Sequence, residues 1–190
     1  MSDLRQAEYT ALRDTIRQRG TTRVCAVLAG LASWGALIIT LSITELEGAV
    51  ALAPLVVLAT AFEVNFFLHT GVERIGRYIQ VFYEEAADSV GWETTAMQYG
   101  STFTATPRTA GAPRAASSGG AGIDPLFVAI FSVSTAVNFV SSLPEARQPG
   151  WIAISFSAHL LFAYRIVAAR RAAAHQRALD LDRFRRLVSK

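Results

Sequence analysis

Apolar residues along this chain are concentrated in four blocks, separated by stretches in which polar and charged residues recur. A helix rises about 1.5 Å per residue, so about 20 apolar residues are enough to cross the hydrocarbon core of a bilayer. The pattern therefore predicts four membrane-spanning helices. Their expected boundaries are 24–43, 49–70, 125–143 and 151–168.

Segments next to these blocks keep a helical period while mixing charged and apolar residues. At the N-terminus, Tyr9, Leu12 and Ile16 fall on one face, as in an amphipathic helix, and Gly20 is expected to end it. The second span has no strong breaker after it and is expected to continue as a helix. The predicted extensions are residues 1–23, 71–87 and 169–190.

Residues 88–123 are rich in Gly, Ala, Ser, Thr and Pro, which predicts a flexible linker. Asp124 and Pro125 favour a helix start, and residues 144–150 are expected to form a turn. The expected fold class is all-α: a four-helix transmembrane bundle with amphipathic cytoplasmic helices at both termini.

The charge distribution predicts an orientation. If the N-terminus is inside, Arg147 is the only one of the 18 Lys and Arg residues in an outer loop. Positively charged loops stay on the inner side, so both termini are expected to face the cytoplasm from the inner (plasma) membrane. No cleavable signal peptide is expected. The single cysteine, Cys25, excludes an internal disulfide and is expected to be a buried, inert thiol.

Five polar side chains in the predicted spans are candidates for a binding site. Ionisable groups are costly inside a membrane and should face the protein or a water-filled cavity. They predict a polar path or small site that relays protons or coordinates a cation. The alternative is that they hydrogen-bond between helices and fix the packing. The candidates are Glu63, Asn65, His69, Asn138 and His159.

The helix expected after the second span offers a different kind of candidate. Arg74, Arg77, Tyr78 and Phe82 could bind a protein partner or lipid headgroups, or could pack against the two terminal helices. Packing is the favoured interpretation, because those helices must bury their apolar faces. Near the end of the fourth span, Arg165 is expected to reach the headgroups.

The sequence favours no enzyme class. It holds no nucleophile elbow, phosphate loop or metalloprotease motif, and no cofactor, metal or nucleic acid is expected. The leading hypothesis is a non-enzymatic scaffold or signalling protein with the lipid bilayer, a cytoplasmic protein and further copies of itself as partners. The alternative is an oligomeric ion channel or proton-coupled transporter that uses the polar residues of the second span.

Two segments resemble a recurring type of uncharacterised bacterial multi-pass membrane protein. EYTALRDTIRQRG before the first span is similar to an EYxxLRxxIxxR pattern, and RIGRYIQVFYEE, followed by GWE, is similar to RIGxYIxxFxE after the second. The resemblance implies no catalytic or binding role. It implies a shared cytoplasmic helical layer formed by Leu12, Arg13, Ile16, Arg74, Tyr78 and Glu84.

Overall fold

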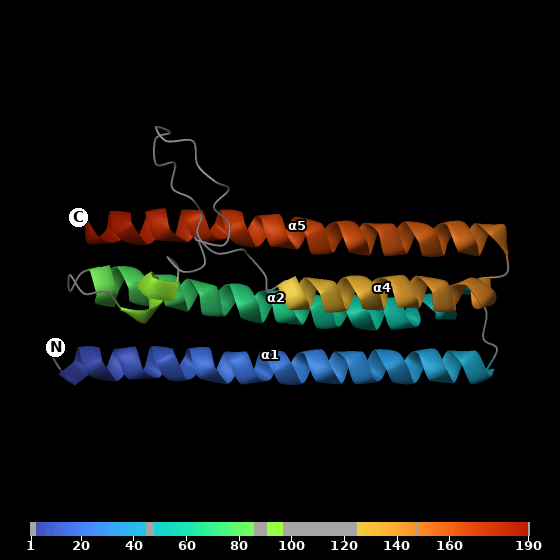
Figure 1. The fold of residues 1–190 in the computed structure, drawn as a ribbon, viewed down its shortest axis with the longest axis horizontal. Helices are drawn as coiled ribbons and strands as arrows, with labels where there is room; N and C mark the ends of the chain where they lie inside the picture. The colour runs from blue at the N-terminus through green and yellow to red at the C-terminus, as the bar shows by residue number, and fades with distance from the viewer. Residues whose placement is uncertain (1–2, 45–47, 86–90, 97–124, 147, 190) are drawn as a thin grey trace, which may run out of the picture. The chain divides into compact units, whose positions relative to one another are not determined.

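The computed structural model describes residues 3–44, 48–85, 91–96, 125–146 and 148–189. All regular secondary structure in these ranges is helical, which agrees with the predicted all-α class (Figure 1). Residues 92–96 form a short helical turn. The other elements are α1 (Asp3–Thr44), the 3-10 helix η1 (Gly48–Leu52), α2 (Ala53–Ile79), the π-helix η2 (Gln80–Glu84), α4 (Pro125–Ala146) and α5 (Pro149–Val188).

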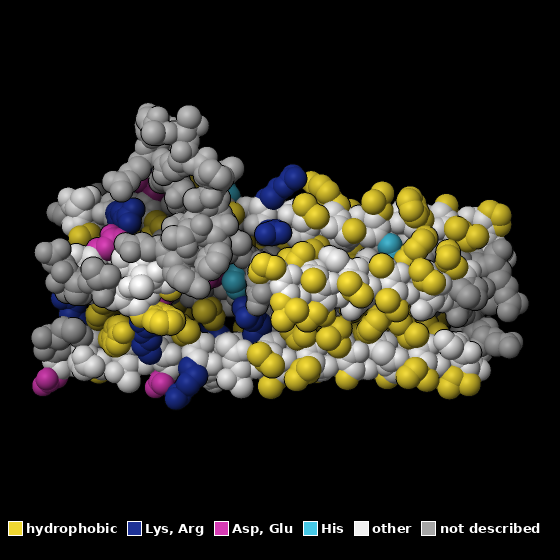
Figure 2. All heavy atoms as spheres, in the orientation of Figure 1, with side chains coloured by type: hydrophobic (Ala, Val, Ile, Leu, Met, Phe, Trp, Pro, Cys, Tyr) yellow, Lys and Arg dark blue, Asp and Glu magenta, His cyan; other side chains and the backbone are white. Residues whose placement is uncertain are grey.

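Four of the described helical stretches are long and apolar enough to cross a membrane, as the hydrophobic pattern predicts. Figure 2 shows hydrophobic side chains gathered on the visible face of α4 and on the adjoining parts of α1 and α5. The four stretches are Asp3–Thr44, Gly48–Glu84, Pro125–Leu143 and Pro149–Val188.

Several predicted boundaries are wrong because the helices run further than expected. α1 continues through Gly20, and one glycine inside a helix costs only about 1 kcal/mol. α4 continues to Ala146, and α5 begins at Pro149, where the fixed φ of proline suits a first helical position. The turn expected over 144–150 is therefore too long. The predicted linker holds a helical turn at 92–96, and its residues 88–90 and 97–123 lie outside the described ranges.

The chain divides into two compact units, which are described separately. Helices α1, α2 and α5 contribute to both, and α4 belongs to unit 2. Unit 1 comprises Met1–Gly20, His69–Gly122 and Arg170–Lys190, and unit 2 comprises Thr21–Leu68 and Ile123–Ala169.

The core of unit 2 is built around Phe62 of α2, which is fully buried. Its ring centroid lies 5.6 Å from that of Phe127, 5.4 Å from that of Phe131 and 5.7 Å from that of Phe162. These separations are in the range that favours aromatic pairs. One α2 side chain thus packs against both α4 and α5.

Cys25 on α1 lies outside this core and is exposed, so the expectation that its thiol is buried is wrong.

Gly30 allows α1 to approach α2 closely. A Cβ atom added at Gly30 would lie 2.5 Å from the Cβ of Ala61, closer than real Cβ contacts. Gly35, on the same helix, has nothing within 4 Å of an added Cβ. Small residues at such a crossing allow the backbones to approach, which is a main source of helix association in membranes.

Gly30→Ala is therefore expected to destabilise unit 2, whereas Gly35→Ala is not. The new methyl group at position 30 forces the two helices apart, and overpacking of this kind typically costs about 1–3 kcal/mol. At position 35 the same change should be neutral or stabilising by about 0.5–1 kcal/mol, because alanine favours the helix. Thermal unfolding followed by circular dichroism in detergent micelles measures both. Equal stabilities of the two variants would contradict the assigned contact.

Candidate functional site

Two of the predicted binding residues, Asn138 and His159, are hydrogen-bonded to each other inside unit 2. Asn138 Nδ2 lies 2.8 Å from His159 Nε2, and Trp34 Nε1 donates to Asn138 Oδ1 over 2.9 Å. Asn138 is 1% exposed and His159 5%. The chain of hydrogen bonds therefore joins α1, α4 and α5 through buried side chains.

Donor counting in this chain fixes the protonation of the histidine. An indole N–H only donates, so Trp34 requires the oxygen of Asn138 to face it. The amide nitrogen of Asn138 then donates to Nε2 of His159, which must be an acceptor. Nδ1 lies 2.7 Å from the backbone oxygen of Ser155 and carries the proton. His159 is thus the neutral Nδ1–H tautomer, and both of its nitrogen atoms are engaged.

Serine hydroxyls extend the network along α4 and α5. Ser142 Oγ donates to the backbone oxygen of Phe139 over 2.8 Å, and Ser155 Oγ lies 2.9 Å from Ser142 Oγ. Because Ser142 uses its proton on the backbone, Ser155 is the donor in the hydroxyl pair. These groups therefore satisfy one another's hydrogen-bonding capacity.

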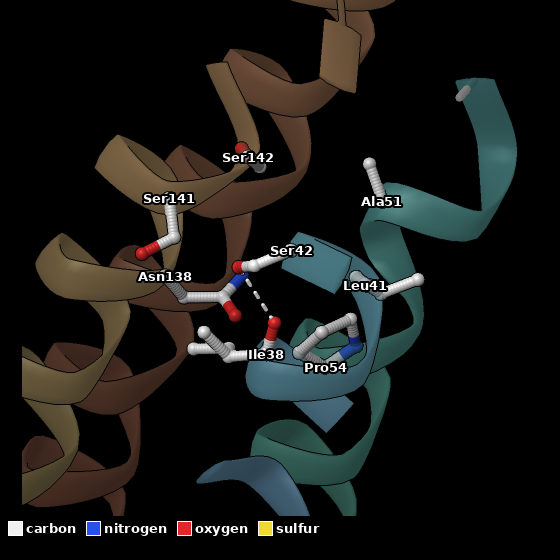
Figure 3. Close-up of a pocket in the computed structure, with 8 residues that line it drawn as sticks. All are labelled: Ile38, Leu41, Ser42, Ala51, Pro54, Asn138, Ser141 and Ser142. Carbon is white, nitrogen blue, oxygen red and sulfur yellow. Dashed lines mark hydrogen bonds between the residues drawn. The ribbon is translucent and has the colours of Figure 1, made fainter. Parts of the chain in front are cut away.

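A cavity of about 10 Å³ adjoins the network (Figure 3). One water requires about 10–15 Å³, so the cavity is no larger than a single water site. Ser42 beside it donates to the backbone oxygen of Ile38 on its own helix (Figure 3). The lining residues are Ile38, Leu41, Ser42, Ala51, Pro54, Asn138, Ser141 and Ser142.

Glu63 forms an ion pair on unit 2, apart from the Asn138 network. Arg165 Nη2 of α5 lies 2.7 Å from Glu63 Oε2, and the side chains are 37% and 48% exposed. The guanidinium also lies 5.0 Å from the ring centroid of Phe66. Arg165, which was expected to reach the headgroups, is thus held at the Glu63 carboxylate of α2 while remaining partly exposed.

Asn65 and His69 are the two remaining candidates from the predicted spans. Asn65 is fully buried, and its Nδ2 donates to the backbone oxygen of Ala61 over 2.8 Å. Its Oδ1 has no hydrogen-bond partner among the described residues. His69 is half-buried and belongs to unit 1. The described contacts therefore separate the five predicted residues into an Asn138–His159 pair, Glu63 with Arg165, and two further positions.

In unit 1, Arg77 is the centre of a buried ion-pair cluster. Its Nη2 lies 3.1 Å from Asp180 Oδ2 on α5, and its Nη1 lies 3.0 Å from Glu73 Oε2. The Arg77 and Asp180 side chains are only 4% and 5% exposed. Burial lowers the pKa of the Arg77 guanidinium, and the two carboxylates oppose that shift. Arg74 is more exposed and reaches Asp180 at 3.5 Å.

The aromatic candidates of unit 1 pack against the terminal helices. The Tyr78 ring stacks on Phe82 with centroids 4.6 Å apart, and both rings face Phe184 of α5 at 5.7 and 6.1 Å. Tyr9 of α1 lies 5.4 Å from Tyr83. The Tyr78 hydroxyl also donates to Glu8 Oε1 of α1 over 3.0 Å. These contacts favour the packing interpretation of Tyr78 and Phe82.

Glu84 holds the helical turn at 92–96 against η2. It accepts hydrogen bonds from the backbone N–H groups of Glu93 at 2.9 Å and Thr94 at 2.8 Å. A carboxylate at the first N–H groups of a helix satisfies donors that have no helical partner. Gly91 leaves room for this contact, because a Cβ there would overlap the Glu84 carboxyl group and displace it. Arg13 of α1 completes the contact through an ion pair with Glu93 at 2.6 Å.

The partners Trp34, Arg165 and Asp180 were not among the sequence-predicted site residues. Each lies on a different helix from the candidate it binds, and helical spacing orders only residues on one helix. Opposite charge was the available signal for two of these pairs, Arg165 with Glu63 and Asp180 with Arg77. Among the described residues, no group of three His, Cys, Asp or Glu side chains is arranged to hold a metal ion.

Comparison with known proteins assigns no family to this arrangement. No protein-family model matches the chain, and no significant match was found among curated proteins or solved structures. The class that the chain itself defines is an all-helical protein with four helices able to span a membrane.

Asn138→Leu is expected to break the interhelical network while Ser132→Leu leaves it intact. The first change removes the acceptor of Trp34 and the donor to His159, and an interhelical hydrogen bond of this kind contributes about 0.6–2 kcal/mol. Ser132 is an exposed residue of α4 and serves as the matched control. The indole N–H signal of Trp34 in ¹⁵N-labelled protein should move only in Asn138→Leu. A shift of equal size in both variants would contradict the hydrogen bond.

Asp180→Asn is expected to destabilise unit 1 by up to about 3–5 kcal/mol, because it removes one of the two carboxylates that hold the buried Arg77 charge. Replacing both residues, as Arg77→Met with Asp180→Leu, should recover most of that loss. Asp182→Asn breaks only an exposed pair with Arg186 and should change stability by less than about 1 kcal/mol. Chemical unfolding of the full chain in micelles measures all three. A double variant no more stable than Asp180→Asn would contradict this account.

Proposed function

We propose that the protein is a non-enzymatic integral membrane protein whose apolar helices anchor a helical cytoplasmic module, and that this module carries a scaffolding or signalling function. In this proposal the helices of unit 2 form a four-helix transmembrane bundle in the inner membrane. Unit 1 is the module, with both termini in the cytoplasm. The amphipathic terminal helices supply its outer faces.

The single observation that carries the proposal is the pairing of polar groups within unit 2. His159 has both ring nitrogen atoms engaged, and Asn138 bonds to Trp34 as well as to His159. A proton relay or ion path needs groups that exchange partners and a hydrated route. Beside this network the described residues line a cavity about one water in size and a larger, mainly apolar hollow of about 240 Å³ on α4 and α5, which His159 also borders. The intramembrane polar residues therefore support packing as their role.

Unit 1 supports the other half of the proposal. Its helices are joined by ion pairs to α5: Arg77 of α2 pairs with Asp180, and Glu85, just after η2, pairs with Arg185. The Arg185 guanidinium lowers the pKa of the Glu85 carboxyl group, which keeps that pair charged at neutral pH. A module with so many interhelical ion pairs requires water at its surface, which is consistent with a location outside the bilayer.

Site-specific photocrosslinking in cells tests the proposal. A benzophenone side chain at Leu4 or Leu187, both exposed on unit 1, should yield discrete protein adducts. At Val133 or Leu161, both exposed on unit 2, it should yield lipid adducts instead. The leading function would be overturned by lipid adducts from the unit 1 positions or by protein adducts from unit 2 alone.

The half-exposed Glu63–Arg165 pair supports a second candidate, an oligomeric channel or proton-coupled transporter. A charged pair at the surface of an apolar unit is costly in lipid, and further copies of the chain could enclose it. Flux of protons or cations into proteoliposomes distinguishes the two functions. The scaffold predicts no flux above protein-free liposomes, whereas the transporter predicts flux that Glu63→Gln abolishes and the matched change Glu85→Gln preserves.

A further inference from the structure

A cavity of about 210 Å³ opens within unit 1, between α1, α2, η2, the helical turn at 92–96 and α5. It is far larger than the 10–15 Å³ or so that one water needs, and has room for a molecule of several heavy atoms. Charged side chains from three different elements line it. They are Glu73, Arg77, Glu93 and Arg177.

The charges of this lining are balanced. Two carboxylates face two guanidinium groups, so the four lining charges sum to zero. A ligand with a net charge would give the site an excess of the ligand's own sign, and the lining groups of that sign would repel it. A neutral molecule that carries separated positive and negative groups can pair with both kinds of lining charge at once.

Arg77 has a donor left over for a ligand. Its side chain is 4% exposed and lines the cavity, and its Nε–H has no hydrogen-bond partner among the described residues. Its other two nitrogen atoms bind Glu73 and Asp180. Buried donors are nearly always paired, and a guanidinium N–H is well suited to a carboxylate or phosphate oxygen.

Glu93 lines the same cavity with a carboxyl group, which suits a positively charged group of a ligand. Burial raises the pKa of its carboxyl group, Glu84 and Glu73 add to that shift, and Arg13 opposes it. A positive group beside Glu93 would favour the ionised form. Trp92 beside it is 71% exposed at the wall of the cavity, and an indole face attracts organic cations.

We propose that this cavity binds a small zwitterion, with its ammonium group against Glu73 and Glu93 and its carboxylate or phosphate against Arg77. The inference rests on the proposed function in one respect, which is that the ligand serves as the signal that unit 1 detects. A free amino acid or betaine and the headgroup of a zwitterionic lipid share this chemistry.

Ligand-detected saturation-transfer NMR on the full chain in micelles tests the class of ligand. The probes are the neutral L-amino acids, glycine betaine and glycerophosphoethanolamine, with choline and acetate as single-charge halves. At least one zwitterion is expected to bind with a Kd below about 10 mM, and each half is expected to bind at least about tenfold more weakly, a difference of about 1.4 kcal/mol. Binding of glycerophosphoethanolamine alone would indicate a headgroup, and binding of amino acids or betaine a free solute.

Two variants place the bound probe in the cavity. Glu93→Gln removes one carboxylate, and Gly76→Ala adds a methyl group whose Cβ would lie 2.9 Å from Glu93 Oε2. Both should weaken binding about tenfold or more, and alanine at position 76 should keep α2 intact because it favours a helix. Asp182→Asn, outside the cavity, should leave binding unchanged.

No zwitterion bound below 10 mM, choline or acetate bound as tightly as the zwitterions, or binding unaffected by both variants would each overturn the proposal. Circular dichroism confirms that each variant is folded, and if Glu93→Gln unfolds, Gly76→Ala decides alone. The proposed function has a separate test: flux that depends on Glu63 would overturn it. That result would not change the binding measured here.

Discussion

The structure depends on one constraint, which is that a polar or charged group removed from water must find a partner inside the protein. In unit 2 an indole, an amide and an imidazole satisfy one another across three helices. In unit 1 the buried Arg77 is held by carboxylates from its own helix and from α5. In both units the polar contacts therefore decide which helices meet and in which register.

These polar contacts specify which helices pair and in which register, which apolar packing alone does only weakly. Membrane helices gain no hydrophobic driving force from meeting one another, because lipid tails are as apolar as their side chains. The aromatic contacts of Phe62 could be made by several neighbouring rings, whereas Trp34 can donate only to an acceptor at one height on α4. Small residues such as Gly30 allow the helices to approach closely. The hydrogen bonds around Asn138 then fix the register in which those helices pack.

The sequence predicts the helical class and the four apolar stretches because both depend on local composition and period. It also predicts that the second span continues past Gly71 and Gly76, which α2 and η2 do. It fails where a glycine or a proline was read as an ending, since a long helix tolerates one weak position when its neighbours favour the helix.

The candidate residues themselves were recognisable, but their grouping was not. Asn138 and His159 could be named as polar residues of two spans, yet their partner Trp34 looks like any aromatic residue of an apolar helix. Arg74 and Arg77 were named together as candidates, although the structure buries Arg77 and exposes Arg74. Burial is decided by where α5 places Asp180, a long-range contact that no spacing within α2 encodes.

The orientation of Asn138 links this packing to the question of function. If His159 took a second proton, Nε2 would become a donor and would face the amide N–H₂ group of Asn138. Rotating the amide by half a turn would satisfy His159 but would bring two donors together at Trp34. Either arrangement leaves one buried donor unpaired, at a cost of about 1–3 kcal/mol. The network therefore favours a neutral histidine through the tryptophan, an arrangement suited to holding three helices together and poorly suited to passing protons along them.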